Sequence, residues 1–212
     1  IDTVSHQKET IAIDQLIISD ARVALEQLAS VLATATIHPF SAWLGKCLEW
    51  KKRYPVCLPE YASAPDEINM YSFVDELSRQ SVAGDIFIAD AGSAFYTVSQ
   101  GVMLKPGQRY IPSAAMATMG FSLPAALGAA LADPGNRVFA ITGDGSLQQN
   151  IQELQCLVHH KLNIKVFVLN NDGYLSIRIA QKNYYQGRFI GEDKDSGLSF
   201  PSLQKLADAY GI

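Results

Sequence analysis

Residues 143–171 read GDGSLQQNIQELQCLVHHKLNIKVFVLNN, and this stretch decides the fold. An apolar run of strand length stands before each polar end: RVFAIT before the glycine-rich turn, and IKVFVL before the paired asparagines. Between them apolar residues recur at helical spacing: Ile151, Leu154, Leu157 and Val158. The pattern predicts a strand–helix–strand unit, whose right-handed crossover makes the two strands parallel. Asp144 and Asn171 are therefore expected at the same carboxyl edge of one sheet.

These two polar residues indicate a site for a cation and a phosphate. Neighbouring strands lie about 5 Å apart, so a carboxylate and an amide oxygen at their ends can reach one hard cation. Glycine amides at the helix start would face a phosphate. We therefore predict a place that holds a metal-bridged diphosphate. The alternative is that Asp144 only caps the following helix and that Asn170 and Asn171 only form a turn; it explains each end separately but not the pair.

The composition describes a soluble globular protein. The chain has 212 residues, of which 18% are charged and 48% hydrophobic, enough for one full core plus an appendage. A net charge of −4 gives no support for a nucleic-acid partner, which would normally require a basic patch. No apolar run approaches the length that spans a bilayer. The N-terminus is not a signal peptide. Three scattered cysteines without a CxxC pair predict a reducing cytoplasm and no disulfide or zinc site.

Three regions follow one another along the chain. Residues 1–34 contain the strand-like IAIDQLIIS and then a helix that begins after Asp20; we expect the remnant of a preceding central α/β domain. Residues 35–65 are expected to be a connector, with a short helix around 41–53 and a proline-bearing extended segment. Residues 66–212 alternate between strand and helix patterns. Their alternation predicts an α/β fold with a mostly parallel sheet and helices on both faces.

The third region has a predicted order of elements. They are a helix to about Ser81, the strand DIFIAD, a helix around Ala94–Gln100, a short strand near Tyr110, a helix over Pro124–Ala132, the strand–helix–strand unit and a last helix that ends at Gly211. The chain opens without methionine and closes one residue after that glycine. We therefore expect a piece of a longer polypeptide, truncated at both ends and incomplete at the C-terminus.

The glycine-rich turn, the strand–helix–strand span and the terminal NNDG occur together. In that combination they resemble the thiamine diphosphate-binding motif of thiamine-dependent enzymes. The resemblance implies thiamine diphosphate and Mg²⁺ as cofactors. It implies three metal ligands: Asp144, the side-chain oxygen of Asn171 and the backbone carbonyl of Gly173. It also implies cofactor contacts at the start of the helix: Gly143, Gly145 and Ser146.

Two upstream segments extend the resemblance. IADAGSAF (88–95) ends a strand in a glycine turn, where the family reaches the diphosphate through the positions of Gly92 and Ser93; alternatively Ser93 is only a helix N-cap. ATMGFSLPAALGAALADP (117–134) is similar to a stretch of the acetolactate synthase branch. There the Met119 side chain would fold the cofactor, and the Met119 amide and the Ala117 carbonyl would bond its aminopyrimidine. The family usually has glycine at 117, and Met119 could instead fill a core gap.

The resemblance also implies an activity. It identifies a thiamine diphosphate-dependent transferase or lyase: a decarboxylating carboligase similar to acetolactate synthase, which takes a 2-keto acid such as pyruvate. Folding brings the amino group of the cofactor next to its reacting carbon. The family's activating glutamate lies on a pyrimidine-binding domain of a second subunit, which no part of this chain resembles. We therefore expect no catalytic residue in this chain, no activity from it alone, and a homo-oligomer such as a dimer for the full-length protein.

The residues after NNDG indicate which branch of the family the chain resembles. Ser176 and Ile177 are expected to contact the cofactor, and Ile177 stands where decarboxylases carry a catalytic glutamate. An apolar residue there favours carboligation over aldehyde release. The alternatives are a thiamine-dependent decarboxylase of the benzoylformate or indolepyruvate type, a catalytically silent relative, and a Rossmann-like binding module, whose G-x-G-x-x-G is missing. The acceptor substrate stays open, as does the role of residues 187–201, a solvated connection or a lid.

Overall fold

The computed structural model describes residue 3 and residues 12–36, 39–62 and 67–212. The chain divides into two compact units, Ile1–Tyr54 and Pro55–Ile212. The boundary between them falls inside the predicted connector. The assignment of residues 1–34 to a preceding domain stays a prediction.

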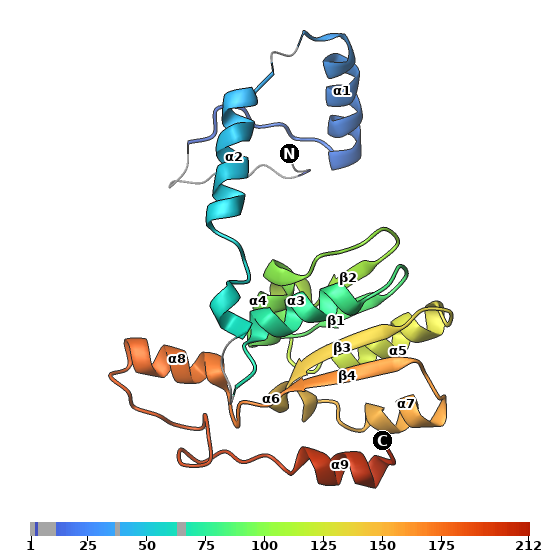
Figure 1. Cartoon of the computed structure of the whole chain (residues 1–212), viewed down its shortest axis with the longest axis vertical. Coiled ribbons are helices and arrows are strands. Elements are labelled where there is room, and N and C mark those ends of the chain that lie inside the picture. The colour runs from blue at the N-terminus through green and yellow to red at the C-terminus, as the bar shows by residue number, and fades with distance from the viewer. Residues whose placement is uncertain (1–2, 4–11, 37–38, 63–66) are drawn as a thin grey trace. The chain divides into compact units, whose positions relative to one another are not determined.

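The helices (α) and strands (β) are labelled in Figure 1, and two short 3-10 helices (η) lie between them in the chain. In chain order the elements are α1 (Ala21–Thr34), α2 (Ser41–Arg53), η1 (Pro59–Ala62), α3 (Met70–Gln80), β1 (Ile86–Ala89), α4 (Gly92–Gly101), β2 (Arg109–Pro112), η2 (Ala114–Met116), α5 (Ser122–Ala132), β3 (Val138–Gly143), α6 (Asp144–Leu147), α7 (Glu153–His159), β4 (Ile164–Leu169), α8 (Leu175–Tyr184) and α9 (Leu203–Tyr210). None of the helices among the described residues is long and apolar enough to cross a membrane.

The first unit contains the two helices that the sequence predicts. Asp20 is the N-cap of α1, where its carboxylate accepts the amides of Arg22 and Val23 at 2.9 and 3.4 Å. The strand expected over 11–19 is not formed by residues 12–19, apart from a single bridge residue at Ile18, and Ile11 lies outside the described residues. A strand is stabilised by pairing with a neighbour, and the described part of this unit contains no other strand.

The second unit is built on a sheet of four parallel strands in the order β2-β1-β3-β4. β3 lies beside β4, with register from Val138↔Ile164 to Gly143↔Leu169. The strand–helix–strand unit read from the sequence is therefore confirmed, together with its parallel pairing. β1 is buried along its whole length and β3 along all but its last residue, which is typical of central strands in a sheet covered on both faces.

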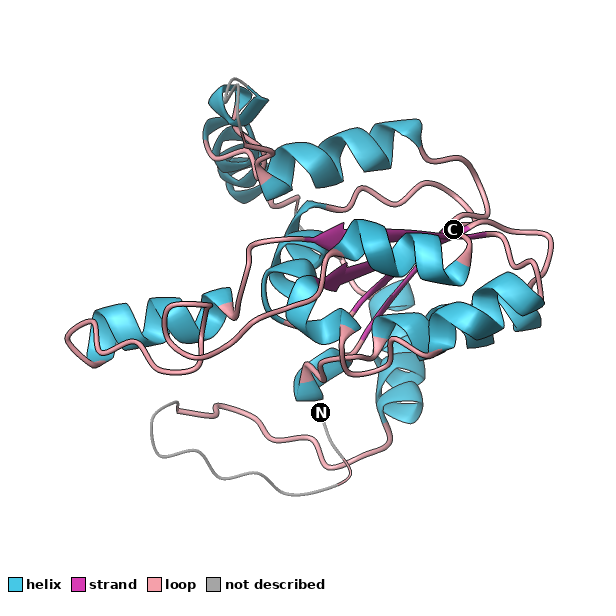
Figure 2. Ribbon diagram, turned by 90° about the horizontal axis from the view of Figure 1, so that it is seen from below, coloured by secondary structure: helices cyan, strands magenta, loops and turns pink. Residues whose placement is uncertain are grey.

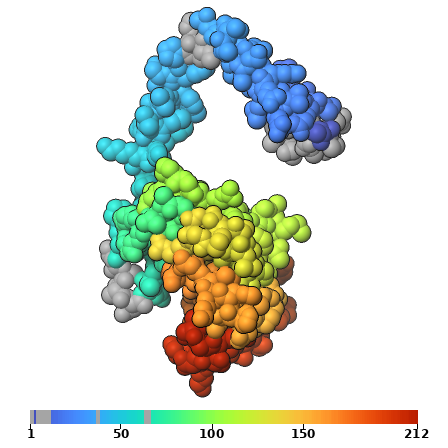
Figure 3. All heavy atoms as spheres, turned by 90° about the vertical axis from the view of Figure 1, so that its right-hand side faces the viewer, coloured from blue at the N-terminus to red at the C-terminus, as the bar shows by residue number. Residues whose placement is uncertain are grey.

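Helices cover both faces of this sheet (Figure 2). Alternate strand residues point to opposite faces. On one face Ile88 and Ala140 pack with Ala126 of α5; on the other, Ala89 and Ile141 pack with helices α3 and α4. A third cluster joins α5, α6, α7 and α9 to β4: Leu123, Leu147, Leu154, Ile151, Val166, Val168, Leu203 and Tyr210. Figure 3 shows the second unit as one continuous body. The predicted α/β class is confirmed.

One predicted helix is broken in the structure. The sequence indicates a single helix between β3 and β4, whereas α6 and α7 are separated by residues 148–152. The backbone there makes tighter i→i+3 bonds, as from Glu153 N to Asn150 O at 3.1 Å. The side-chain amide of Asn150 donates a hydrogen bond to the backbone carbonyl of Gly120 at 2.7 Å. This long-range bond offsets the loss of helical bonds and joins the segment to the turn before α5.

The order of the strands determines where a ligand can bind. From β1 the chain moves to β2 on one side, and it later returns to place β3 on the other side. β1 and β3 are neighbours, and the loops that follow them run in opposite directions. In open α/β sheets, ligands bind in the crevice between two such loops, which is called the topological switch point. The carboxyl ends of β1, β3 and β4 all face this crevice.

Candidate functional site

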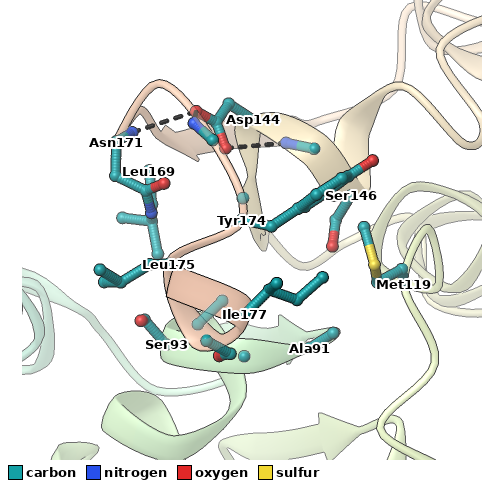
Figure 4. Close-up of a pocket in the computed structure, with 16 residues that line it drawn as sticks. Ala91, Ser93, Met119, Asp144, Ser146, Leu169, Asn171, Tyr174, Leu175 and Ile177 are labelled. Carbon is teal, nitrogen blue, oxygen red and sulfur yellow. Dashed lines mark hydrogen bonds between the residues drawn. The ribbon is translucent and has the colours of Figure 1, made fainter. Parts of the chain in front are cut away.

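A pocket of about 180 Å³ lies at this switch point. Its walls come from the start of α4, the Met119 turn, the start of α6 and the segment that joins β4 to α8 (Figure 4). The lining residues are Ala91, Gly92, Ser93, Ala94, Met119, Gly143, Asp144, Gly145, Ser146, Leu169, Asn171, Gly173, Tyr174, Leu175, Ser176 and Ile177. Every site residue predicted from the sequence is among them except Ala117. Their roles toward a cofactor stay predictions.

The Asp144 carboxylate joins the ends of β3 and β4. It is 2% exposed. One oxygen accepts the Gly145 amide at 2.8 Å, and the other accepts the amides of Asn171 and Gly173 at 3.1 and 3.2 Å. Figure 4 shows Asp144 and Asn171 together at one end of the pocket, with Ala91 and Ser93 at the other. Asp144 therefore does more than begin its own helix, because it organises the turn that follows the neighbouring strand.

The oxygen atoms around this carboxylate suit a hard cation. The side-chain oxygen of Asn171 is buried and has no hydrogen-bond partner among the described residues, and such an atom is costly unless something binds it. A carboxylate offers about four acceptor positions, and hydrogen bonds occupy three of those on Asp144. With the Gly173 carbonyl, these groups would make up the all-oxygen set that Mg²⁺ prefers. The residues present thus fit the predicted metal.

Helix starts provide the positive side of the pocket. α4 begins at Gly92 and α8 at Leu175, each with ten residues, and the first amides of a helix lack partners within it and favour an anion. A Cβ placed on Gly92 would lie 3.4 Å from the Ser176 hydroxyl, so the two helix starts face each other closely. The N-cap of α4 is Ala91 rather than Ser93. The N-cap alternative for Ser93 is therefore wrong.

Two glycines of the site are required by their surroundings. A Cβ on Gly145 would lie 2.3 Å from the Tyr174 ring, which packs edge-on against Phe200. A Cβ on Gly173 would lie 2.0 Å from the Glu192 backbone oxygen. Neither position can hold a side chain without displacing a neighbour. The two glycines therefore allow the loops on either side of Asp144 to approach each other.

Met119 and Ala117 differ in how they relate to the pocket. Met119 lines it and is 37% exposed, so the alternative that this side chain fills a core gap is wrong. Ala117 does not line the pocket. It adopts the left-handed conformation with φ 45° and ψ 46°, which glycine adopts more easily than alanine. This backbone conformation accounts for the glycine that the family usually has at this position.

The sequence reasoning missed Asp90. This residue follows β1 and is fully buried. Its carboxylate accepts the Thr142 hydroxyl at 2.6 Å and the Ala91 amide at 2.7 Å, and burial raises its pKa above the ordinary value. Asp90 thus links the end of β3 to the loop that enters α4. The sequence feature that could have identified Asp90 is its position, because Asp90 directly follows β1 as Asp144 directly follows β3.

The loop over residues 187–201 contains a second residue that was missed. Glu192 is 2% exposed, and its carboxylate accepts Arg178 Nε at 2.5 Å. This bond raises the pKa of Arg178 above its ordinary value. Glu192 stands in the charged run GEDKDSG, which is typical of a solvated loop, so no sequence signal distinguished it from its neighbours.

Comparison with known proteins agrees with this site. Residues 90–212 match the model for the C-terminal TPP-binding domain of thiamine pyrophosphate enzymes. The chain belongs to the thiamine pyrophosphate enzyme family. The matched range includes every residue that lines the pocket.

Relatives within the family are large subunits of acetolactate synthase. The chain is 33% identical to the large subunit from Cyanidium caldarium, over 92% of this chain and 33% of that protein. It is also 33% identical to the isozyme 3 large subunit from Escherichia coli, over 100% of this chain and 36% of that protein. The chain therefore spans about a third of the length of these curated relatives.

Proposed function

We propose that this chain is the diphosphate- and Mg²⁺-binding part of a thiamine diphosphate-dependent carboligase that acts on 2-keto acids such as pyruvate. The observation that carries the proposal is the cluster around Asp144. Its carboxylate accepts hydrogen bonds from the backbone amides of Asn171 and Gly173, and the buried side-chain oxygen of Asn171 has no hydrogen-bond partner in the part of the chain that the structure describes. The match of residues 90–212 to a thiamine pyrophosphate-binding domain supports it.

Each group would hold a different part of the cofactor. Asp144, Asn171 and the Gly173 carbonyl would bind Mg²⁺. The start of α4, with Gly92 and Ser93, and the turn 143–146 would bind the diphosphate. Met119 would support the rings, with backbone bonds from Met119 and Ala117 to the pyrimidine. When bound, the cofactor supplies the carbon centre that takes up the electrons released as CO₂ departs.

Ile177 favours carboligation over simple decarboxylation. It lines the pocket close to Ser176 and is 44% exposed, so it faces the space where a substrate would lie. An apolar side chain supplies no proton, and release of an aldehyde needs one. The acetolactate synthase relatives agree with this choice.

The proposal includes what lies outside this chain. A pyrimidine-binding domain from a second subunit would supply the activating glutamate, so that the full-length protein works as a homo-oligomer and the 212-residue chain alone turns over no pyruvate. We also propose a cytoplasmic location, since all three cysteines are free thiols.

Calorimetry tests the binding part of the proposal. Thiamine diphosphate is titrated into the 212-residue chain with Mg²⁺ and with a chelator, for the wild type, Asp144→Ala and Asp85→Asn. Asp85 is a buried aspartate of the same unit that precedes β1, at the opposite rim of the sheet. We expect Mg²⁺-dependent binding that Asp144→Ala abolishes and Asp85→Asn preserves. Equal affinity of Asp144→Ala and wild type would reject the metal assignment.

A product assay tests the reaction. The full-length protein is incubated with pyruvate alone and then with candidate 2-keto acid acceptors, and the 212-residue chain is assayed in parallel. We expect ligated 2-hydroxy-keto acids from the full-length protein and no CO₂ from the short chain. Free aldehyde as the main product would support the decarboxylase alternative, and CO₂ from the short chain would contradict its proposed inactivity.

A further inference from the structure

Glu192 contacts the turn after β4 through both its backbone and its side chain. The Tyr174 amide donates to the Glu192 backbone oxygen at 2.8 Å. The Glu192 carboxylate accepts Arg178 Nε at 2.5 Å, and only 3% of its side chain is exposed. Burial of a carboxylate is costly unless a cation and hydrogen bonds compensate it. The Arg178 bond therefore fixes where Glu192 lies, and the backbone of Glu192 fixes where Tyr174 lies.

The same two residues close around Gly173. An ideal Cβ on Gly173 would lie 2.0 Å from the Glu192 oxygen and 2.7 Å from Arg178 Nη2. The Gly173 amide meanwhile donates to the Asp144 carboxylate at 3.2 Å. Gly173 is thus held by Asp144 through its amide, and it is in close contact with Glu192 and Arg178. Little space is left for the turn to move.

Further bonds fix the loop that carries Glu192. The Gln181 side chain both donates to and accepts from the backbone of Ile190, at 3.0 Å each. The Ser196 hydroxyl accepts the amides of Glu192 and Asp193 at 2.9 Å each. Tyr174, Arg178 and Gln181 are spaced four and three residues apart, so they share one face at the start and along the length of α8. The loop is therefore attached to that face at three points.

We propose that Glu192, through Arg178, is a positioning residue for the turn Asn171–Tyr174. By holding the Tyr174 amide and the Gly173 backbone, the pair fixes the turn that bears two of the proposed Mg²⁺ ligands, Asn171 and Gly173. The link to Mg²⁺ rests on the proposed function, whereas the fixing of the turn does not. The loop 187–201 then has a role in the site without touching the cofactor.

A second ion pair provides a matched control. Arg137 donates to the Asp85 carboxylate at 2.7 Å, with Asp85 2% and Arg137 34% exposed, close to the 3% and 31% of Glu192 and Arg178. Both residues precede strands, at the amino rim of the sheet. A pair that only stabilises the fold should behave like this one when it is broken.

The test uses Glu192→Gln, Arg178→Lys and Asp85→Asn in the 212-residue chain. Amide hydrogen exchange of the cofactor-free proteins is the first measurement. We expect Glu192→Gln to speed exchange at Gly173 and Tyr174 by about tenfold, the factor for about one hydrogen bond, relative to amides in β3. Arg178→Lys, which keeps the charge on a partly exposed side chain, should have a smaller effect on the same amides. Asp85→Asn should leave the ratio unchanged.

The second measurement is Mg²⁺-dependent affinity for thiamine diphosphate by calorimetry. We expect a loss of about tenfold for Glu192→Gln and less than twofold for Asp85→Asn. Unchanged protection of Gly173 and Tyr174 in both pair variants overturns the proposal, as does an equal change in Asp85→Asn. Faster exchange with unchanged affinity overturns the link to Mg²⁺. If the wild-type 212-residue chain binds no cofactor, the proposed binding by this chain alone fails, and the exchange data alone decide whether Glu192 positions the turn.

Discussion

Replacement of Gly173 by alanine provides a strong test of the packing around the site. The new Cβ would lie 2.0 Å from the Glu192 backbone oxygen, and ordinary contact begins at 3.4 Å. One of the two backbones must therefore move by about 1.4 Å. A backbone atom cannot turn aside as a flexible side chain can, so the displacement spreads to the bonds that both residues make.

The cost of this change can be worked out from those bonds. A shift of that size breaks the bond from the Tyr174 amide to the Glu192 oxygen, now 2.8 Å long, which contributes about 1 kcal/mol. Overpacking of a tight site adds about 1–3 kcal/mol. We therefore expect Gly173→Ala to lower the free energy of unfolding of the second unit by about 3 kcal/mol.

Two other glycines separate sterics from backbone conformation. Gly191 has φ +64°, and no described residue has an atom within 4 Å of an ideal Cβ built on it, so Gly191→Ala carries backbone strain alone, about 1 kcal/mol. Gly128 lies within α5 with open space around it, so Gly128→Ala should stabilise the unit by about 0.5–1 kcal/mol. The expected order of stability is Gly128→Ala, wild type, Gly191→Ala, Gly173→Ala.

Urea denaturation followed by far-ultraviolet circular dichroism measures this order. Both tryptophans, Trp43 and Trp50, lie in α2 of the first unit, so the second unit has no tryptophan of its own to report its unfolding. A Gly173→Ala variant within about 0.5 kcal/mol of wild type, the range of ordinary surface substitutions, would refute the reasoning. So would a loss equal to that of Gly191→Ala, because strain alone would then explain it.

Two further predictions concern buried or strained positions. Burial raises the folded-state pKa of Asp90 above its ordinary value, so between the unfolded-state and the folded-state pKa the folded chain binds more protons than the unfolded chain. Wild type should therefore lose stability relative to Asp90→Asn as pH rises from about 4 through that window. Urea midpoints of both proteins at several pH values measure this, and a constant difference would contradict it. Ala117→Gly should raise the free energy of unfolding by about 0.5–1 kcal/mol, because relief of left-handed strain exceeds the added chain entropy; an unchanged urea midpoint would count against that.

The core of the fold could be predicted because its signals are local and agree with one another. The apolar runs that became β3 and β4 have strand length, the residues between them have helical spacing, and only a right-handed parallel arrangement connects them. The sequence also predicts where two helices begin, after Asp20 and at about Ser41. The break between α6 and α7 could not be predicted, because it depends on the bond from Asn150 to Gly120, thirty residues away in sequence.

The residues of the candidate site also fall into two groups, those that the sequence could predict and those that it could not. The proximity of Asp144 and Asn171 could be predicted because Asp144 directly follows β3 and Asn171 comes two residues after β4, where parallel pairing brings the two strand ends together. Gly173, four residues after β4, is predicted only by the family resemblance. Glu192 could not be predicted, because its burial depends on how a long loop folds back onto α8. The same charged residue types occur in solvated loops and in buried ion pairs, and only the tertiary contacts of the folded chain distinguish the two.

The role of Asp144 explains why adjacent strands suffice to build the predicted cation site. Its carboxylate accepts hydrogen bonds from the backbone amides of Asn171 and Gly173. The turn that carries the other two proposed ligands is thereby ordered when the chain folds. The entropy of ordering that turn is lost on folding rather than on binding, so the proposed cation would meet a prearranged set of oxygens. This arrangement also accounts for the buried Asn171 side-chain oxygen, which has no hydrogen-bond partner among the residues that the structure describes: the neighbouring backbone is already bonded, and this oxygen is the group that the proposed ligand would satisfy.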